Sequence, residues 1–145
     1  RKLRNIIHSL SVSKSVCTPV LVTVVGLGFV TNMAEYMVAS DIVVTKAGPG
    51  TIAEAASLGL PVLMTSFLPG QEAGNVDYVL EKGFGEYCDD PVHIADQVAE
   101  WLQRPEKLVD MSAKALAVGR PEAASEIVQD IGSITHTWMA MNNVN

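Results

Sequence analysis

The sequence predicts an α/β domain in which one parallel sheet carries helices on both faces. Short apolar runs rich in β-branched residues, typical of buried strands, recur along the chain. Stretches with helical spacing of apolar residues lie between them, and glycine- or proline-rich breaks separate the two kinds of segment. Because neighbouring parallel strands need a long crossover connection, this alternation favours a small Rossmann-like sheet with its ligand at the carboxyl ends of the strands.

The first part of the chain contains a predicted helix, a strand and a second helix. Residues 1–10 place apolar side chains at helical spacing, and residues 20–25 form a β-branched run that is typical of a buried strand. The run ends at the sequence GLG, which lacks the third glycine of a dinucleotide-binding motif. A helix is expected over residues 33–40, with Thr31 or Asn32 as its cap.

The middle of the chain alternates between strand and helix. The expected elements, in order, are a strand at 42–45, a helix at 51–58, a strand at 62–66, a helix at 71–82 and a short edge strand at 86–88. Gly59 follows the first of these helices in the place where helices commonly end. In the second helix, Val76, Val79 and Leu80 are expected to face the core.

Three helices are expected at the C-terminal end. Asp90 followed by Pro91 predicts a capped helix start, and this helix should run to residue 103. Two more helices are expected at 106–118 and from residue 121 or 122 to about residue 139, followed by a loose tail at 140–145. The side chains expected in the core here are Ile94, Val98, Trp101, Leu102, Leu108, Met111, Ala115 and Leu116.

Length and charge limit the possible functions. The 145 residues are expected to form a single domain. The net charge of −6 argues against nucleic acid as a partner and gives no support for electrostatic attachment to an anionic membrane. The chain has no apolar run long enough to span a membrane and no signal or transit peptide. Because it begins without methionine inside a predicted helix, a fragment and a natural truncated product both remain open.

The glycine turn between the second predicted strand and its helix is a candidate phosphate site. Residues 47–50, Ala-Gly-Pro-Gly, break the strand, and Thr51 stands three residues before Glu54 in the pattern of a capping box. A strand, a glycine turn and a helix N-terminus together offer free backbone N–H groups and the positive end of a helix dipole to an anion. The alternative is an ordinary turn whose glycines only make the corner.

The loop after the strand at 62–66 carries polar side chains to the same edge of the sheet. Gln71, Glu72 and Asn75 stand at a predicted helix start, with Gln71 and Asn75 on one face. An amide beside a carboxylate can bind vicinal sugar hydroxyls, and Glu54 could bind a ribose diol in the same way. The alternative is that Gln71 and Glu72 are solvated residues favoured by the helix dipole, and that Glu54 caps its own helix.

The sequence shows no catalytic group and no metal site. There is no Ser/His/Asp grouping, no HExxH motif and no paired metal-ligand spacing. His8, His93 and His136 are predicted in helices far from the strand-end loops. The residues alone therefore predict a binding half-site without a catalytic base and without a cofactor.

Three segments resemble a known family. GFVTNM, DIVVTKAGPGTIAEAASLGLPVLM and LPGQEAGNVDYVLEKGFG, over about residues 28–131, are similar to the C-terminal half of plant-type monogalactosyldiacylglycerol synthase, a relative of the bacterial lipid-intermediate glycosyltransferase of peptidoglycan synthesis. The resemblance implies a B-type glycosyltransferase fold of two Rossmann-like domains facing across a cleft. This chain would be the C-terminal, nucleotide-sugar-binding domain. The catalytic base and the acceptor-binding surface would belong to an N-terminal domain that is absent from this chain.

The resemblance also implies roles for individual residues. Phe29 and Val30 would flank the uracil of UDP-galactose, and Glu54 would bind the ribose hydroxyls. The diphosphate would be held by Gly48, Gly50 and Thr51. The galactose and distal phosphate would be faced by Gln71, Glu72 and Asn75.

The implied reaction is transfer of galactose from UDP-galactose to diacylglycerol, with inversion at the sugar. The chain alone is expected to bind the donor without catalysing transfer. By the same resemblance it is expected at the chloroplast envelope, attached peripherally to the membrane. Two alternatives are a UDP-N-acetylglucosamine-dependent lipid-intermediate glycosyltransferase domain and a non-catalytic protein that binds nucleotide-sugar or has a regulatory role.

Overall fold

The computed structural model describes residues 23–142, which fall into two units, a first of residues 23–33 and a second of residues 34–142. In the first unit, residues 23–25 form no strand, and Val24 and Val25 are exposed. The predicted strand at 20–25 is therefore wrong over these three residues. An apolar β-branched run becomes a buried strand only where a second strand pairs with it. Residues 20–22 and the predicted helix at 1–10 lie outside the described residues.

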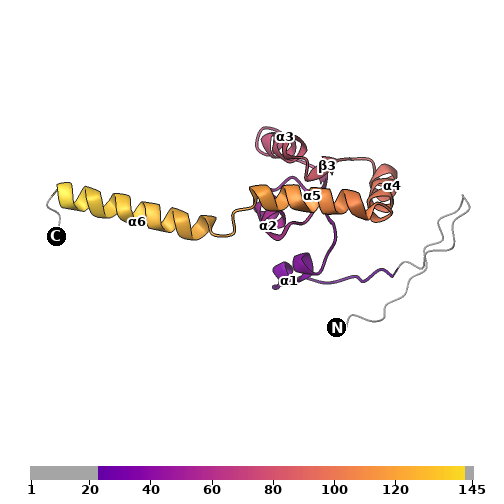
Figure 1. Cartoon of the computed structure of the whole chain (residues 1–145), viewed down its shortest axis with the longest axis horizontal. Coiled ribbons are helices and arrows are strands. Elements are labelled where there is room, and N and C mark those ends of the chain that lie inside the picture. Colours follow the sequence, from indigo (N-terminus) through magenta and orange to yellow (C-terminus); the bar gives the residue numbers. More distant parts are fainter. Residues whose placement is uncertain (1–22, 143–145) are drawn as a thin grey trace, which may run out of the picture. The chain divides into compact units, whose positions relative to one another are not determined.

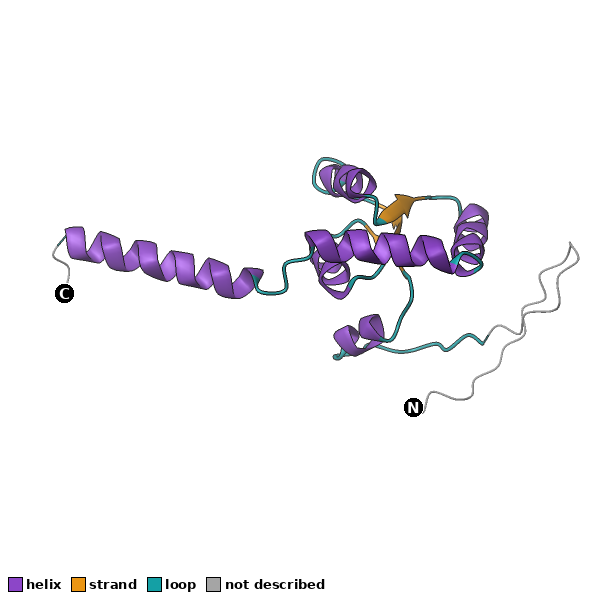
Figure 2. Cartoon of the chain, viewed as in Figure 1, coloured by secondary structure: helices purple, strands orange, loops and turns teal. Residues whose placement is uncertain are grey.

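The second unit is built on a parallel sheet (Figures 1 and 2). Its strands are β1 (Val43–Lys46), β2 (Val62–Ser66) and β3 (Gly85–Tyr87), in the order β1-β2-β3. Val62 is opposite Val43 on one side and Gly85 on the other. The crossovers are α2 (Pro49–Leu58) between β1 and β2, and α3 (Ala73–Lys82) between β2 and β3. The predicted alternation of strand and helix is confirmed.

Successive side chains of β2 point to opposite faces of the sheet, and this produces two apolar layers. Val62 and Met64 face a core formed with α2 and α3, whereas Leu63 faces a second core on the other side of the sheet. That second core contains Trp101 of α4 (Pro91–Leu102) and Met111 of α5 (Pro105–Val118). Helices therefore cover both faces, as the sequence predicted.

Three predicted core residues are exposed. Leu80 of α3, Leu102 of α4 and Leu116 of α5 each leave about half of their surface to solvent, at 46%, 55% and 57%. Each lies one position along the helix from a buried residue, and one position is a rotation of about 100°. Helical spacing identified the buried face of each helix correctly, but the predicted core included one neighbouring residue that the structure exposes.

Helix ends follow their capping residues. α2 begins at Pro49, with Gly48 as cap, and α3 begins at Ala73. The predicted capping box is wrong, because Thr51 is already inside α2 and no side chain caps that helix. Gly59 and Gly83 end α2 and α3 in the left-handed conformation, with φ of 67° and 72°. Asp90 caps α4 as predicted, since its carboxylate accepts from the N–H groups of Val92 and His93.

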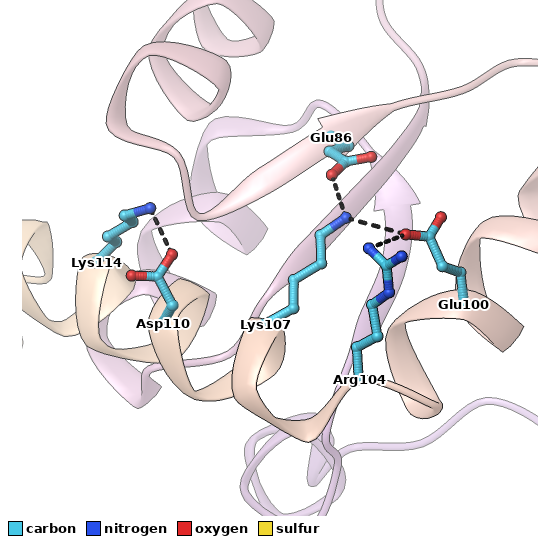
Figure 3. A network of polar contacts seen from close by, with 6 residues as sticks. All are labelled: Glu86, Glu100, Arg104, Lys107, Asp110 and Lys114. Atoms are coloured by element: carbon cyan, nitrogen blue, oxygen red, sulfur yellow. Dashed lines mark hydrogen bonds and ion pairs between the residues drawn. The ribbon is translucent and has the colours of Figure 1, made fainter.

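Ion pairs connect α5 with β3 and α4 on one side of the unit (Figure 3). The Lys107 ammonium lies 2.9 Å from a Glu86 carboxylate oxygen and 3.9 Å from Glu100, which also pairs with Arg104 at 3.0 Å. The Lys107 ammonium also lies 5.4 Å from the centroid of the buried Trp101 ring. Lys114 and Asp110 form a separate pair one turn apart on α5, at 2.5 Å.

α1 (Met33–Val38) contributes the buried Met37 to the core that contains Val62 and Met64, whereas α6 (Ala123–Met141) lies outside the sheet layers. α6 confirms the last predicted helix but ends at Met141, so residues 140 and 141 are helical and the predicted tail is wrong there. Residues 143–145 lie outside the described part. α6 buries no residue, and it exposes a row of apolar side chains, Ile127, Ile131, Ile134, Trp138 and Met141. Within residues 23–142, no helix is long and apolar enough to cross a membrane.

Candidate functional site

Two loops meet at the carboxyl ends of β1 and β2. Lys46 at the end of β1 is opposite Ser66 at the end of β2, and the Ala47 N–H donates to the Ser66 carbonyl at 2.8 Å. The chain then enters α2 after Gly48 and α3 after Glu72. The N-termini of both crossover helices thus begin at the same edge of the sheet, where parallel α/β sheets bind their ligands.

The N-terminus of α2 has N–H donors that no other group of residues 23–142 uses. The Gly48 N–H donates to the Lys46 carbonyl at 2.8 Å, and Pro49 has no N–H. The N–H groups of Gly50 and Thr51 come before the first intrahelical hydrogen bond, from Ile52 to Gly48, and no side chain caps them. A methyl group added at Gly50 would meet nothing within 4 Å. Of the three predicted phosphate-binding residues, Gly50 and Thr51 therefore have N–H groups free for an anion.

Glu72 is the buried polar residue of the site. One carboxylate oxygen accepts a hydrogen bond from the Lys46 ammonium at 2.5 Å, and the other accepts from the Leu68 N–H at 2.8 Å. The Glu72 side chain is 10% exposed, while that of Lys46 is 58% exposed. The hydrogen bond from Lys46, followed by the one from Leu68, lowers the pKa of Glu72. The interpretation of Glu72 as a solvated helix-start residue is wrong.

Asn75 and Gln71 do not share a helical face as predicted. α3 begins at Ala73, so Gln71 lies in the turn before it, where its side chain is exposed. Asn75 lies in the first turn of α3, and its amide donates a hydrogen bond to the Ala47 carbonyl at 2.9 Å. The Asn75 side chain thereby joins α3 to the loop after β1.

Glu54 is exposed on α2, six positions after the Gly48 cap. Within the described part of the chain its carboxylate has no hydrogen bond or ion pair to another residue. Its alternative role as a cap of its own helix is wrong, because caps act within the first turn. The carboxylate is free to bind a ligand.

Phe29 and Val30 belong to the first unit, and the structure describes them only within it. Phe29 is 98% exposed and Val30 is partly buried. An aromatic ring with that exposure is available for stacking. Their predicted contact with uracil stays a prediction.

Lys46 is the site residue that sequence reasoning missed. It opens the KAGPGT motif, and a cation at the last position of a strand before a glycine turn was the signal available. No metal site accompanies it, since no three His, Cys, Asp or Glu of residues 23–142 are grouped to hold an ion. His93 and His136, both exposed, lie on α4 and α6 outside the two loops, and His8 lies outside the described residues.

Fold and loops together define the class of protein. Residues 8–127 match the family model of the glycosyltransferase family 28 C-terminal domain, and the chain belongs to this family. It is 50% identical over 105 residues to a probable chloroplastic monogalactosyldiacylglycerol synthase of Nicotiana tabacum, covering 72% of this chain and 20% of that protein. It is 47% identical over 108 residues to the chloroplastic monogalactosyldiacylglycerol synthase of Spinacia oleracea, covering 74% of this chain and 21% of that protein. The predicted resemblance is confirmed.

A solved structure shows the same fold. MurG of Acinetobacter baumannii superposes with a TM-score of 0.68 and 23% identity, over 79% of this chain and 35% of that one. The domain therefore has the architecture of the C-terminal half of a B-type glycosyltransferase. The chain spans about a fifth of the length of the curated relatives it matches.

Proposed function

We propose that this chain is the donor-binding domain of a hexosyltransferase that transfers galactose from UDP-galactose to diacylglycerol. The observation that carries the proposal is the pair of loops at the ends of β1 and β2, where the free N–H groups of Gly50 and Thr51 begin α2, the helix that also carries the exposed carboxylate of Glu54. The relatives with about half identical residues are named monogalactosyldiacylglycerol synthases, and this supports galactose and diacylglycerol as the substrates.

Each part of the donor has a proposed partner. The uracil lies against Phe29 and Val30, and the ribose hydroxyls bind Glu54. The diphosphate lies over the turn of Gly48, Gly50 and Thr51. The galactose end of the site is formed by Gln71, Glu72 and Asn75.

The turn at α2 would also assist the chemistry. Departure of UDP places negative charge on the diphosphate, and the N–H groups and dipole of a helix N-terminus stabilise that charge. The acceptor hydroxyl needs a base. On the family resemblance we propose that the base and the acceptor site belong to an N-terminal domain outside this chain, so that the chain alone binds donor without transferring galactose.

The relatives are named chloroplastic. For this chain we propose the chloroplast envelope, with peripheral attachment to the membrane that holds the acceptor lipid. Detection of a tagged chain in the stroma alone would contradict this location.

Calorimetric titration of the chain with UDP-galactose and with UDP tests the proposal. The wild type should bind both, and Glu54→Ala should weaken both about five- to a hundred-fold, the loss of one hydrogen bond of about 1–3 kcal/mol to the ribose. Glu106→Ala, which removes an exposed carboxylate from α5, is the matched control. No binding by the wild type would overturn the proposal. Tighter binding of UDP-N-acetylglucosamine than of UDP-galactose would favour the alternative sugar.

A further inference from the structure

The ion pair between Lys46 and Glu72 suggests that these two residues have different roles in the proposed site. We infer that Lys46 binds the donor diphosphate and that Glu72 positions Lys46 instead of contacting the sugar. This inference rests on the proposed function, and it adds Lys46 to the binding residues and changes the role of Glu72.

The position of the Lys46 ammonium is the first support. Lys46 is the last residue of β1, and its ammonium lies close to Gly48, the cap of α2. A methyl group added at Gly48 would stand 3.1 Å from the ammonium nitrogen and 3.9 Å from a Glu72 carboxylate oxygen. The cation thus lies against the turn that leads into the free N–H groups of Gly50 and Thr51. A phosphate bound to those groups has a positive charge beside it.

The difference in burial between the two partners is the second support. Both carboxylate oxygens of Glu72 already accept hydrogen bonds, and its side chain is nearly enclosed. An ammonium has three N–H donors, and Glu72 takes one from Lys46, whose side chain is mostly exposed. Lys46 can therefore bind an anion without leaving Glu72. Removing Lys46 from the pair would instead leave a buried carboxylate without its cation, which is strongly unfavourable.

The hydrogen bond from the Leu68 N–H extends the role of Glu72. It ties the loop before α3 to the same carboxylate that holds Lys46. Glu72 therefore fixes the cation and also the loop that carries Gln71, whose side chain is exposed toward solvent. Gln71 is left as the polar side chain of this loop that is free to reach the sugar.

Lys46→Ala tests the first half of the inference. It should weaken UDP binding about ten- to a hundred-fold, the effect of one charge-assisted hydrogen bond, and leave the binding of uridine, which has no phosphate, unchanged. Lys114→Ala is the matched control, because it removes a lysine that pairs with a carboxylate at the same 2.5 Å distance on α5. Wild-type UDP affinity in Lys46→Ala would overturn the inference and leave the proposed function standing. Absence of UDP binding by the wild type would overturn both.

Glu72→Gln tests the second half. A positioning role predicts that the affinities for UDP and for UDP-galactose fall by the same factor, because both ligands contain the diphosphate. A sugar contact predicts a loss for UDP-galactose alone, and that result would overturn the inference. Asp110→Asn is the charge-matched control. If Glu72→Gln does not fold, Glu72→Asp is the second variant, because it keeps the charge but shortens the side chain that reaches Lys46. An equal loss of affinity for UDP and UDP-galactose would again support the positioning role, and a loss for UDP-galactose alone would overturn it.

Discussion

The side-chain amide of Asn75 donates a hydrogen bond to the main-chain carbonyl of Ala47 at 2.9 Å, joining positions 28 residues apart. Ala47 is fully buried and lies between β1 and the Gly48 cap of α2. This bond, together with the ion pair between Lys46 and Glu72, holds the two loops of the candidate site against each other. The geometry of the site therefore depends on contacts between α3 and the end of β1.

Asn75→Ala should separate those loops at a modest cost in stability. Loss of one partly buried hydrogen bond that leaves the Ala47 carbonyl unsatisfied is expected to cost about 1–3 kcal/mol. We expect a lower urea midpoint with an unchanged slope. Gln71→Ala, which removes an exposed amide from the turn just before α3, should leave the midpoint near that of the wild type. Equal stability of the two variants would show that the bond to Ala47 contributes little.

Acid should remove the contribution of Glu72 to stability. Hydrogen bonds from the Lys46 ammonium and then from the Leu68 N–H lower the pKa of Glu72 from its ordinary value of 4.5. The folded protein then binds fewer protons at this group than the unfolded chain. The contribution is thus present above pH 4.5 and is lost as the pH falls through the lower folded pKa. Denaturation midpoints measured from pH 6 downward should fall less steeply for Glu72→Gln. Identical slopes would contradict this assignment.

Gly85→Ala should disrupt the junction between β2 and β3. A methyl group there would stand 2.3 Å from the Val62 carbonyl oxygen and 2.5 Å from a methyl carbon of Val79. The backbone atom cannot move without breaking the strand pairing, so we expect a loss of about 3 kcal/mol or more, beyond the usual range for overpacking. Gly132→Ala on α6, where nothing lies within 4 Å, should be neutral or stabilising by up to about 1 kcal/mol. Thermal unfolding of both variants provides the comparison.

The elements that local patterns determine were predictable from the sequence. β2 has the predicted bounds, and α4 and α5 begin within one residue of their predicted starts, because proline and capping residues specify those ends locally. The run at residues 20–25 shows the limit of such reasoning. Val24 and Val25 have strong strand propensity, but a strand also needs a pairing partner that no local pattern reveals.

The same limit applies to the candidate site. The glycine turn of the motif KAGPGT predicted free N–H groups at the start of the helix, which the structure has at Gly50 and Thr51, because a glycine turn before a helix is a local feature. The pairing of Lys46 with Glu72 joins residues 26 positions apart and depends on two strands being neighbours in the sheet. Spacing along the chain could therefore not show that Glu72 is buried against a cation.

Gly50→Ala distinguishes a phosphate site from an ordinary turn. Gly50 is at the second position of α2, with open space where a side chain would project, so alanine should leave the free energy of unfolding unchanged or slightly raised. If a diphosphate lies against its N–H group, the added methyl group occupies space next to the ligand, and UDP affinity should fall at least about ten-fold, which is 1.4 kcal/mol. Gly132→Ala, the same substitution on α6, should bind UDP like the wild type. If Gly50→Ala also binds UDP with wild-type affinity, Gly50 is part of an ordinary turn between strand and helix and not of a phosphate site.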